Sequence, residues 1–380
     1  MFSIDSLEIE KVHQISYISN KYNIFNKKTS SLVKIQKNFY QFRQKIIIKK
    51  FAILNNLSNK KYTNFSEKFE LLNYINSGSS GIVYKGFNKK NPNHFMCFKF
   101  LLNNNRKNKK NKYKKSLLKE IIIHNKLKND KIIKYYNYIN LRNTGCIVME
   151  YAELGDLDYF RKIVNKKRYF SESLLAFIAL QILQGLYYLN KCKIIHMDIK
   201  EQNLLIDKNL NVKITDFSAS FSYDNFSNDT KILLPFAGTC FYMSPEVMSN
   251  DYIDYKNCNK IDLYSLGIVL YSLAFEQFPF ELNRSDCQNF ELILRNKKRS
   301  RLNIPDNKLY SSMFKNFLIK LLEPNINNRI SIYEALEDSW IKGAEILFEE
   351  KENINDSEIF LINLITDNVR NFNEYINTKK

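Results

Sequence analysis

Glycine, proline and paired cysteines are scarce in this sequence, and each scarcity excludes a class of protein. Nine Gly and six Pro among 380 residues are too few for a collagen-like or flexible Gly/Pro-rich chain. The six Cys form no C-x-x-C pair and no zinc-spaced cluster with His, so we expect reduced thiols. No apolar run reaches the roughly 18 residues of a membrane span, and no signal-peptide core is visible. We therefore expect a cytoplasmic protein, with the nucleus as the alternative, and no integral membrane association.

Basic residues outnumber acidic residues by a wide margin. The chain has 58 Lys and Arg against 39 Asp and Glu, a formal net charge of +19, which invites a nucleic-acid or anionic-membrane partner. Asn, Ile and Tyr are also abundant, a bias typical of AT-rich genomes, so surface drift is the simpler explanation. No nucleic-acid-binding module is recognised, and we expect no nucleic-acid partner. Hydrophobic residues make up 44% and aromatic residues 14%, which excludes wholesale disorder.

A turn with two glycines follows a strand-like segment at residues 69–75. Residues 76–86 read N-S-G-S-S-G-I-V-Y-K-G, and glycines let a backbone approach phosphate groups without a Cβ in the way. Asn76 stands where a further glycine would complete the pattern, and Asn is the residue that next best tolerates positive φ. By itself this pattern is also that of an ordinary hairpin turn.

A lysine and an acid come next along the chain. Residues 95–100 read F-M-C-F-K-F, so strand alternation places Cys97 and Lys99 on one face. Cys97 is expected to be a small buried hydrophobe and not a reactive thiol. Lys99 needs an anionic partner to hold it, and the apolar helical pattern of residues 116–128 contains Glu120. The alternative for Glu120 is an exposed helix residue.

Further motifs follow in the second half of the chain. Residues 194–205 read I-I-H-M-D-I-K-E-Q-N-L-L, and residues 212–218 read V-K-I-T-D-F-S. Residues 238–246 read G-T-C-F-Y-M-S-P-E and residues 262–267 read D-L-Y-S-L-G, with Arg329 further on. The acids, Asn and Lys in these segments are residue types that hold Mg²⁺ and compensate phosphate charge.

In order and spacing, these motifs resemble the eukaryotic protein kinase family, Ser/Thr branch, over about residues 69–341. The resemblance implies an α+β bilobal fold, with a small β-rich N-lobe that includes helix αC and a larger, mainly α-helical C-lobe. It also implies ATP and Mg²⁺ as cofactors and transfer of the ATP γ-phosphate to Ser/Thr hydroxyls of protein substrates. The alternative is a pseudokinase or scaffold that binds ATP or partners without turnover.

The resemblance assigns roles residue by residue. Asp198 accepts or orients the substrate hydroxyl proton, Lys200 offsets charge on the transferred group, and Lys99 is held on the phosphates by Glu120. Asn203 and Asp216 are the expected Mg²⁺ ligands, and Glu246 is expected to pair with Arg329. The expected nucleotide-binding residues are Asn76, Gly78, Ser79, Ser80, Gly81, Val83, Cys97, Lys99, Met149, Glu150, Ala152, Asp156 and Leu205.

Several positions depart from the family pattern. Met197 replaces the Arg that usually grips an activation-loop phosphate, and Pro235 stands at the usual phospho-acceptor position. We hypothesise that phosphorylation at that site is not needed and that Met197 packs under an apolar segment instead. Ser218 replaces the Gly of D-F-G and is expected to stiffen the backbone, while neutral His124 is expected to pack on Phe217. Candidate phosphorylation sites upstream are Tyr223, Ser227 and Thr230.

The motifs divide the chain into regions. We expect a basic N-terminal extension at residues 1–66, a kinase domain at 67–342 and an acidic C-terminal tail at 343–380. The kinase domain is expected to consist of an N-lobe at 67–150 and a C-lobe at 151–342.

An amphipathic helix is predicted in the N-terminal extension at residues 31–50. Basic residues surround one apolar face formed by Leu32, Ile35, Phe39, Phe42 and Ile46. The segment resembles an IQ motif that departs at Tyr40 and Gln41, which favours calmodulin or a calmodulin-like light chain as a partner. A helix docked on the kinase domain is the alternative. A pulldown of residues 31–51 with calmodulin, with and without Ca²⁺, separates the two interpretations.

Overall fold

The computed structural model describes most of the predicted kinase domain. The described residues are 65–78, 81–101, 119–141, 144–164, 170, 172–280, 289–299, 302–305 and 309–343. The IQ-like segment, the acidic tail and the two serines Ser79 and Ser80 of the glycine-containing turn lie outside the described residues.

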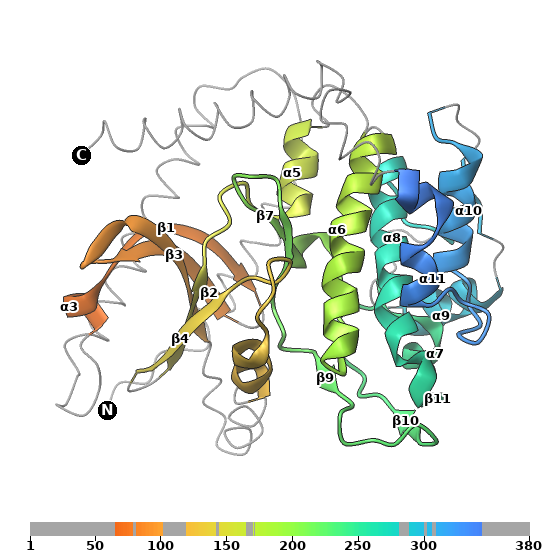
Figure 1. Cartoon of the computed structure of the whole chain (residues 1–380), viewed down its shortest axis with the longest axis horizontal. Coiled ribbons are helices and arrows are strands. Elements are labelled where there is room, and N and C mark those ends of the chain that lie inside the picture. Colours follow the sequence, from red (N-terminus) through yellow and green to blue (C-terminus); the bar gives the residue numbers. More distant parts are fainter. Residues whose placement is uncertain are drawn as a thin grey trace. The chain divides into compact units, whose positions relative to one another are not determined.

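A five-stranded antiparallel sheet forms the N-terminal part of the described chain (Figure 1). Its strands, in spatial order, are β1 (Phe69–Gly78), β2 (Gly81–Asn88), β3 (Asn91–Leu101), β5 (Gly145–Glu150) and β4 (Tyr135–Asn140). The short helix α3 (Phe65–Lys68) precedes β1. Its Phe65 ring lies 5.5 Å from the rings of Phe98 and Phe100 on β3. This aromatic cluster covers one face of the sheet.

The central strand β3 is buried on both faces from Met96 onward, which explains its continuous apolar run. Phe98 and Phe100 face the aromatic cluster, so alternation directs Lys99 to the opposite face. In register, Lys99 lies beside Val83 of β2 and Ile147 of β5. A helix at residues 119–126 follows in the chain. The sheet thus presents one lysine among apolar neighbours toward the rest of the domain.

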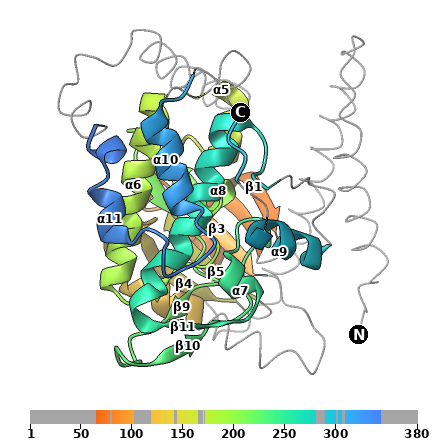
Figure 2. The same cartoon turned by 90° about the vertical axis from the view of Figure 1, so that its right-hand side faces the viewer.

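The remainder of the described chain is mainly helical (Figures 1 and 2). The helices of eight or more residues are α5 (Leu157–Val164), α6 (Glu172–Lys191), α8 (Ile261–Phe275), α9 (Phe290–Arg299) and α10 (Ser312–Leu321). The shorter ones are α7 (Pro245–Met248) and α11 (Ile332–Leu336), with 3-10 turns η1 (Glu201–Asn203) and η2 (Tyr255–Lys260). Helices α6 and α8 lie side by side, α10 packs on α8 and α11 packs on α6. This confirms the expected bilobal α+β fold.

Helix α8 forms the centre of the helical part. It is apolar around its whole circumference and is buried from Ile261 to Ala274, as expected of a core helix. A Cβ on Gly267 would lie 2.8 Å from a Leu322 methyl carbon, so the close approach of α10 requires glycine there. Asp262 in its first turn is the exception to this apolar pattern.

Helix α6 is long and apolar enough to cross a membrane by length and composition alone. However, 61% of its apolar window is buried within the domain. Its Leu175, Ile178, Ile182 and Leu183 belong to the main hydrophobic core. The apolar character of α6 is therefore that of a core helix.

Short strand pairs shape the loops between the two parts. Strand β6 (Ile194–Ile195) pairs with β9 (Phe221–Ser222), and β7 (Leu204–Ile206) pairs with β8 (Val212–Ile214). Further on, β10 (Lys231–Leu233) pairs with β11 (Tyr252–Asp254). Because residues 196–203 connect β6 to β7, and residues 215–220 connect β8 to β9, these pairings bring the two loops together.

Candidate active site

Lys99 joins the sheet to two acidic residues. Its Nζ donates to Glu120 Oε1 at 2.8 Å and to Asp216 Oδ1 at 2.9 Å. The pair predicted between Lys99 and Glu120 is therefore confirmed. Burial disfavours the charged form of Lys99, but the neighbouring Asp216 and Glu120 carboxylates raise its pKa above the ordinary value. Lys99 is a fixed cation between the two lobes.

The two carboxylates around Lys99 have opposite pKa shifts. Burial raises the pKa of Glu120, and the attraction of Lys99 offsets only part of this. Burial also acts on Asp216, but there the Lys99 ammonium dominates and holds the pKa well below its usual range. Asp216 therefore stays ionised at all physiological pH values, as an anionic metal ligand must.

Asp198 is held by side chains from its own loop and from a distant segment. Lys200 Nζ donates to Asp198 Oδ2 at 2.7 Å, and Thr239 Oγ1 donates to Asp198 Oδ1 at 2.7 Å. Asn203 Nδ2 donates to the Asp198 carbonyl at 2.8 Å and to its Oδ2 at 3.0 Å. Lys200 also bonds Thr239 Oγ1 at 2.8 Å. These hydrogen bonds hold the Asp198 carboxylate in one orientation beside Thr239.

The backbone around Asp198 is strained and is held by a buried carboxylate. Met197 has φ of 67°, a conformation that costs a non-glycine residue about 1–3 kcal/mol. Asp262 of α8 accepts from the amides of His196 at 2.7 Å and Met197 at 2.8 Å. These charge-assisted bonds offset the strain. Gly238 approaches the same turn, because a Cβ there would lie 2.1 Å from the Met197 carbonyl oxygen.

Phe217 lies between two histidines. Its ring centroid is 5.0 Å from that of His124 and 5.2 Å from that of His196. His124 Nε2 donates to the Ile133 carbonyl at 2.7 Å, since a carbonyl can only accept. Burial lowers the pKa of His124 to about 4, although that hydrogen bond favours the charged form. His124 is therefore neutral at neutral pH, as expected from the sequence, and packs on Phe217 as an aromatic ring.

The apolar residues expected around the nucleotide base come together in one cluster. Cys97, Met149 and Ala152 are buried there, and Val83 and Leu205 pack against them. Burial raises the pKa of the Cys97 thiol to about 12, so it is the unreactive hydrophobe that the sequence suggests. Four of these five residues lie on strands β2, β3, β5 and β7, and Ala152 follows β5. The cluster lines the side of the sheet that carries Lys99.

The glycine-containing turn and the linker complete this region. Asn76 is an extended residue of β1 paired with Val83, so the positive φ considered for it is not needed. Gly81 is required for another reason, because a Cβ there would lie 2.4 Å from the Phe100 carbonyl oxygen. Gly78 pairs with Gly81 across the turn. Gly81 therefore serves a close backbone approach and does not adopt a positive φ.

The acids of the linker between the two lobes have structural partners. Glu150 Oε1 pairs with Lys213 Nζ at 2.8 Å, and its Oε2 accepts from the Lys134 amide at 2.9 Å. These bonds occupy both carboxylate oxygens of Glu150, and the Glu150 amide donates to the Lys134 carbonyl at 2.9 Å. Asp156 Oδ1 accepts from the Tyr159 amide at 2.8 Å and so caps the start of α5.

The residues expected to hold Mg²⁺ suit that ion. Asn203 uses its amide nitrogen for Asp198, and no described residue donates to its Oδ1. With the Asp216 carboxylate this provides oxygen ligands from two residues. Within the described ranges no group of three or more His, Cys, Asp or Glu could hold a metal. Mg²⁺ commonly takes one or two protein ligands and completes its shell with substrate phosphates and water, so the residues present fit a shared, substrate-bridging ion.

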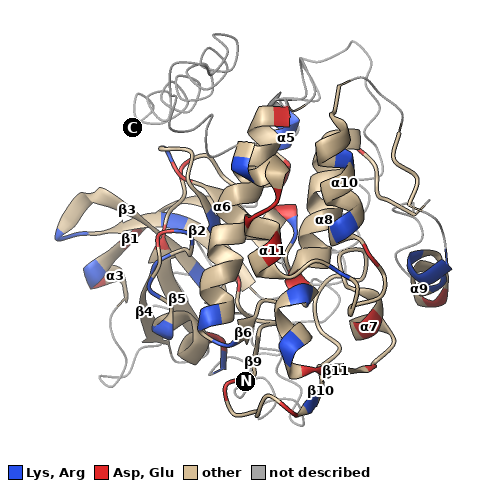
Figure 3. Ribbon diagram, turned by 45° about the vertical axis from the view of Figure 1, so that its right-hand side comes forward, with Lys and Arg blue, Asp and Glu red and all other residues tan. Residues whose placement is uncertain are grey.

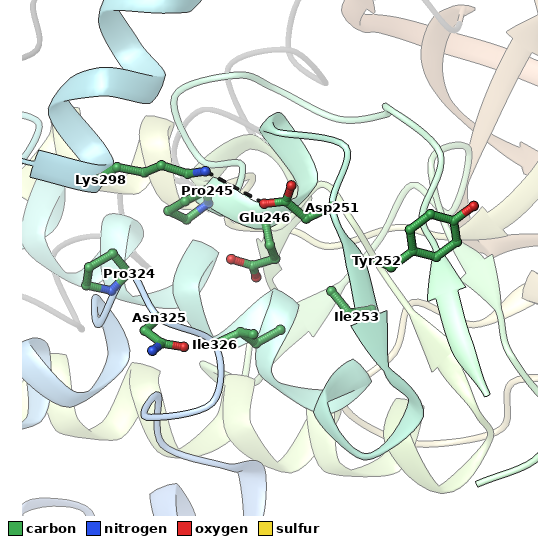
Figure 4. A pocket seen from close by; sticks show the side chains of 9 residues that line it. All are labelled: Pro245, Glu246, Asp251, Tyr252, Ile253, Lys298, Pro324, Asn325 and Ile326. Atoms are coloured by element: carbon green, nitrogen blue, oxygen red, sulfur yellow. Dashed lines mark ion pairs between the residues drawn. The ribbon is translucent and has the colours of Figure 1, made fainter. Parts of the chain in front are cut away.

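A buried ion pair anchors the segment that follows the active site. Arg329 donates to both oxygens of Glu246, at 2.7 Å from Nη1 and 2.9 Å from Nη2. This confirms the pairing predicted from the sequence. A hollow of 260 Å³ lies beside it (Figure 4) and is lined by Pro245, Glu246, Asp251, Tyr252, Ile253, Lys298, Pro324, Asn325 and Ile326. Lys298 and Asp251 pair there at 3.7 Å.

Two supporting residues, Asp262 and Glu201, stand within motifs quoted from the sequence, but the sequence analysis gave them no role. The structure gives Asp262 its role on the amides of His196 and Met197, and a single acid in an otherwise apolar helix is the signal that could have revealed it. Glu201 is buried and accepts from the Tyr242 hydroxyl at 2.5 Å. Nothing in the local sequence distinguishes Glu201 from a solvated loop acid.

The fold and the arrangement of these residues are those of a protein kinase domain. A family model described as Protein kinase domain matches residues 69–341, and the chain belongs to this family. Its relatives are Ser/Thr kinases.

Three relatives illustrate the similarity. The chain is 30% identical over 309 residues to the serine/threonine-protein kinase tousled-like 1 of Mus musculus. This alignment covers 77% of this chain and 40% of that protein. It is 29% identical over 303 residues to the MAP kinase kinase MKK1/SSP32 of Saccharomyces cerevisiae, at 78% and 56% coverage. It is 31% identical over 277 residues to the serine/threonine-protein kinase pakH of Dictyostelium discoideum, at 73% and 50% coverage. The matches thus span about half the length of these relatives.

Proposed function

We propose that this chain is a catalytically competent Ser/Thr protein kinase that transfers the γ-phosphate of ATP to hydroxyl groups of protein substrates. The observation that carries the proposal is the orientation of Asp198, whose carboxylate is bound by Lys200, Asn203 and Thr239 at 2.7–3.0 Å. Such preorganisation is what a phosphoryl transfer requires, since the protein contributes positioning and charge compensation and forms no covalent bond.

Each residue has a task in this mechanism. Asp198 accepts the proton of the substrate hydroxyl as that oxygen attacks the γ-phosphorus, while the bond from this phosphorus to the β–γ bridging oxygen breaks and ADP leaves. Lys200, bound to Asp198, compensates charge on the group being transferred, and Lys99 holds the nucleotide phosphates in place. Asn203 and Asp216 would hold Mg²⁺, which when bound neutralises phosphate charge. Thr239 bonds both Asp198 and Lys200. It therefore holds these two side chains beside the loop that receives the substrate.

The proposal is tested by γ-phosphate transfer with the purified full-length chain and Lys99→Met as the matched variant. Met has a similar length but no charge, so Glu120 and Asp216 lose their shared cation. We expect Lys99→Met to lower kcat/KM by at least about 10²-fold, the scale of one lost electrostatic contact at a reacting group. Equal activity in the two proteins would show contaminating kinase. Absence of transfer with retained ATP binding would favour the pseudokinase alternative.

We further infer that the activation segment is ordered without a phosphate at the usual site. Met197, Ile232 and Leu234 are each less than 5% exposed and belong to one hydrophobic core. The pairing of β10 with β11 holds the same segment, and Pro235 offers no hydroxyl. Burial of apolar side chains thus supplies the order that an Arg–phosphate pair would otherwise supply. Tyr223 is buried and bonded to Asn190, so it is not an accessible acceptor.

A prediction follows for phosphatase treatment. We expect the phosphatase-treated enzyme and the variant Ser227→Ala/Thr230→Ala to retain kcat/KM within about twofold of the untreated wild type. Mass spectrometry of residues 222–239 establishes that the treated protein carries no phosphate. An activating phosphate in that range, with activity lost on its removal, would contradict this inference.

A further inference from the structure

Helix α9 contains a fully buried lysine. Lys298 and Arg299 of its last turn are exposed, and Figure 3 marks the basic residues of this helix in blue. Lys297, between them and the apolar face, is 0% exposed. A buried ammonium group is costly unless its N–H groups are bonded, so the contacts of this residue need a specific account.

Lys297 binds the backbone of the segment that follows Thr239. Its Nζ donates to the carbonyls of Cys240 at 3.0 Å, Phe241 at 2.7 Å and Met243 at 2.6 Å. An ammonium has three donors, and here each meets one carbonyl. Ser265 Oγ of α8 donates to the remaining carbonyl, that of Tyr242, at 2.8 Å. Two side chains thus fix four consecutive carbonyls.

Lys297 has no carboxylate of its own among the described ion pairs. Glu246 of α7 is nearby, but both of its carboxylate oxygens accept hydrogen bonds from Arg329. The Tyr264 ring of α8 lies 5.4 Å from Nζ, and the thiol of Cys240 is on the bound segment itself. The cation is therefore stabilised by the carbonyl dipoles of the loop and by one aromatic face.

We propose that Lys297 is a positioning residue that fixes the segment Thr239–Met243 as the platform on which the protein substrate docks beside Asp198. This rests on the proposed kinase function. The segment begins at Thr239, which bonds both Asp198 and Lys200, so its orientation is coupled to the catalytic carboxylate. Without Lys297, the carbonyls of Cys240, Phe241 and Met243 lose this donor, and leaving a carbonyl of a buried segment without a donor is unfavourable. The loop would rearrange, whereas Lys99, Glu120 and the apolar nucleotide cluster would not.

The platform is expected to respond to pH. Burial lowers the pKa of Lys297 to about 7, with Cys240 and Glu246 favouring the charged form and Arg329 opposing it. A lysine whose folded pKa is lowered is charged below that value and loses its proton as the pH rises through it. The neutral amine has only two N–H groups for three carbonyls. The hold on the segment should therefore weaken above about pH 7.

The test compares wild type, Lys297→Met and Lys297→Arg as full-length proteins. The acceptor is the best peptide from a degenerate Ser/Thr library. We expect Lys297→Met to raise the KM for the peptide about tenfold or more and to leave the KM for ATP within about twofold. In the wild type the peptide KM should rise between about pH 6 and pH 8, and this rise should be absent in Lys297→Met. Arg stays charged throughout this range, so Lys297→Arg should also lack the rise while keeping a lower peptide KM than Lys297→Met.

Unchanged peptide KM in Lys297→Met, or equal increases in both KM values, would overturn the proposal, since the first denies a role and the second indicates a general structural one. If Lys297→Met does not fold, hydrogen exchange of residues 239–243 in the wild type decides. Protection, corrected for intrinsic rates, should fall above about pH 7, and unchanged protection would overturn the proposal. Exchange does not require phosphoryl transfer, so its result is separate from any failure of the kinase function.

Discussion

Asp198→Asn is expected to reduce γ-phosphate transfer by about 10²–10⁴-fold, the usual contribution of a positioned acid–base group. The amide has nearly the same shape, so the loop from His196 to Asn203 keeps its hydrogen bonds to Asp262. It cannot, however, accept the proton of the substrate hydroxyl, and it removes the negative charge bound by Lys200 at 2.7 Å. The loss should therefore appear in kcat.

The measurement pairs initial rates of phosphate transfer with nucleotide binding by calorimetry. Asp198 does not touch Lys99 or the apolar nucleotide cluster, so the Kd for ATP should stay within about threefold. Asp130→Asn is the matched control, because the Asp130 side chain is 76% exposed and its one ion pair among the described residues is with Lys131, at 3.5 Å. It should retain full activity. A rate for Asp198→Asn within a few-fold of the control would remove Asp198 from the catalytic role.

Glu246→Gln is expected to lower the free energy of unfolding by about 3–5 kcal/mol, as when one partner of a buried ion pair is removed. Arg329 is 1% exposed and cannot lose its proton. Its other contacts are carbonyls, such as that of Glu323 at 2.9 Å, and the Tyr264 ring at 4.8 Å. None of these carries a full negative charge, so the variant leaves a buried cation uncompensated.

Chemical denaturation followed by both fluorescence and circular dichroism gives the comparison. Glu337→Gln is the matched control, because the Glu337 side chain is 73% exposed and its pair with Lys342 spans 3.4 Å. Its effect should be within about 0.5 kcal/mol. The double variant Glu246→Gln/Arg329→Met should recover much of the loss, since it removes the isolated charge. A loss below about 1 kcal/mol for Glu246→Gln alone would show that the pair is not the anchor we infer.

The residues of this site that could be predicted from the sequence are those that belong to short motifs with a known chemical role. Lys99 and Glu120 were paired from strand alternation, an apolar helical pattern and the family resemblance, and the structure joins them at 2.8 Å. Glu246 and Arg329, which lie 83 residues apart, were paired from the family resemblance alone, and the structure joins them. Met149 and Leu205 were expected at the nucleotide site from the same resemblance, and the structure buries Met149 and packs Leu205 against its cluster.

Other features depended on which elements pack against each other. Lys297 reads as one basic residue in the run K-K-R at the end of α9, like its neighbours Lys298 and Arg299. Whether such a lysine is solvated or buried is decided by the position of carbonyls from another segment. Glu201 likewise resembles a solvated loop acid until the Tyr242 hydroxyl meets it at 2.5 Å.

The sequence by itself determined the class of protein, the order of its motifs and the residues around the phosphates, because those depend on residue type and spacing along one chain. The tertiary structure alone decided which backbone groups the buried Asp262 and Lys297 bind. Asp262 holds the amides of His196 and Met197, and Lys297 holds the carbonyls after Thr239. The physical reason is that backbone N–H and C=O groups are the same in nearly every residue, so the sequence does not show which of them a side chain will bind. The hydrogen-bonding partner of each group is chosen only when the chain is packed.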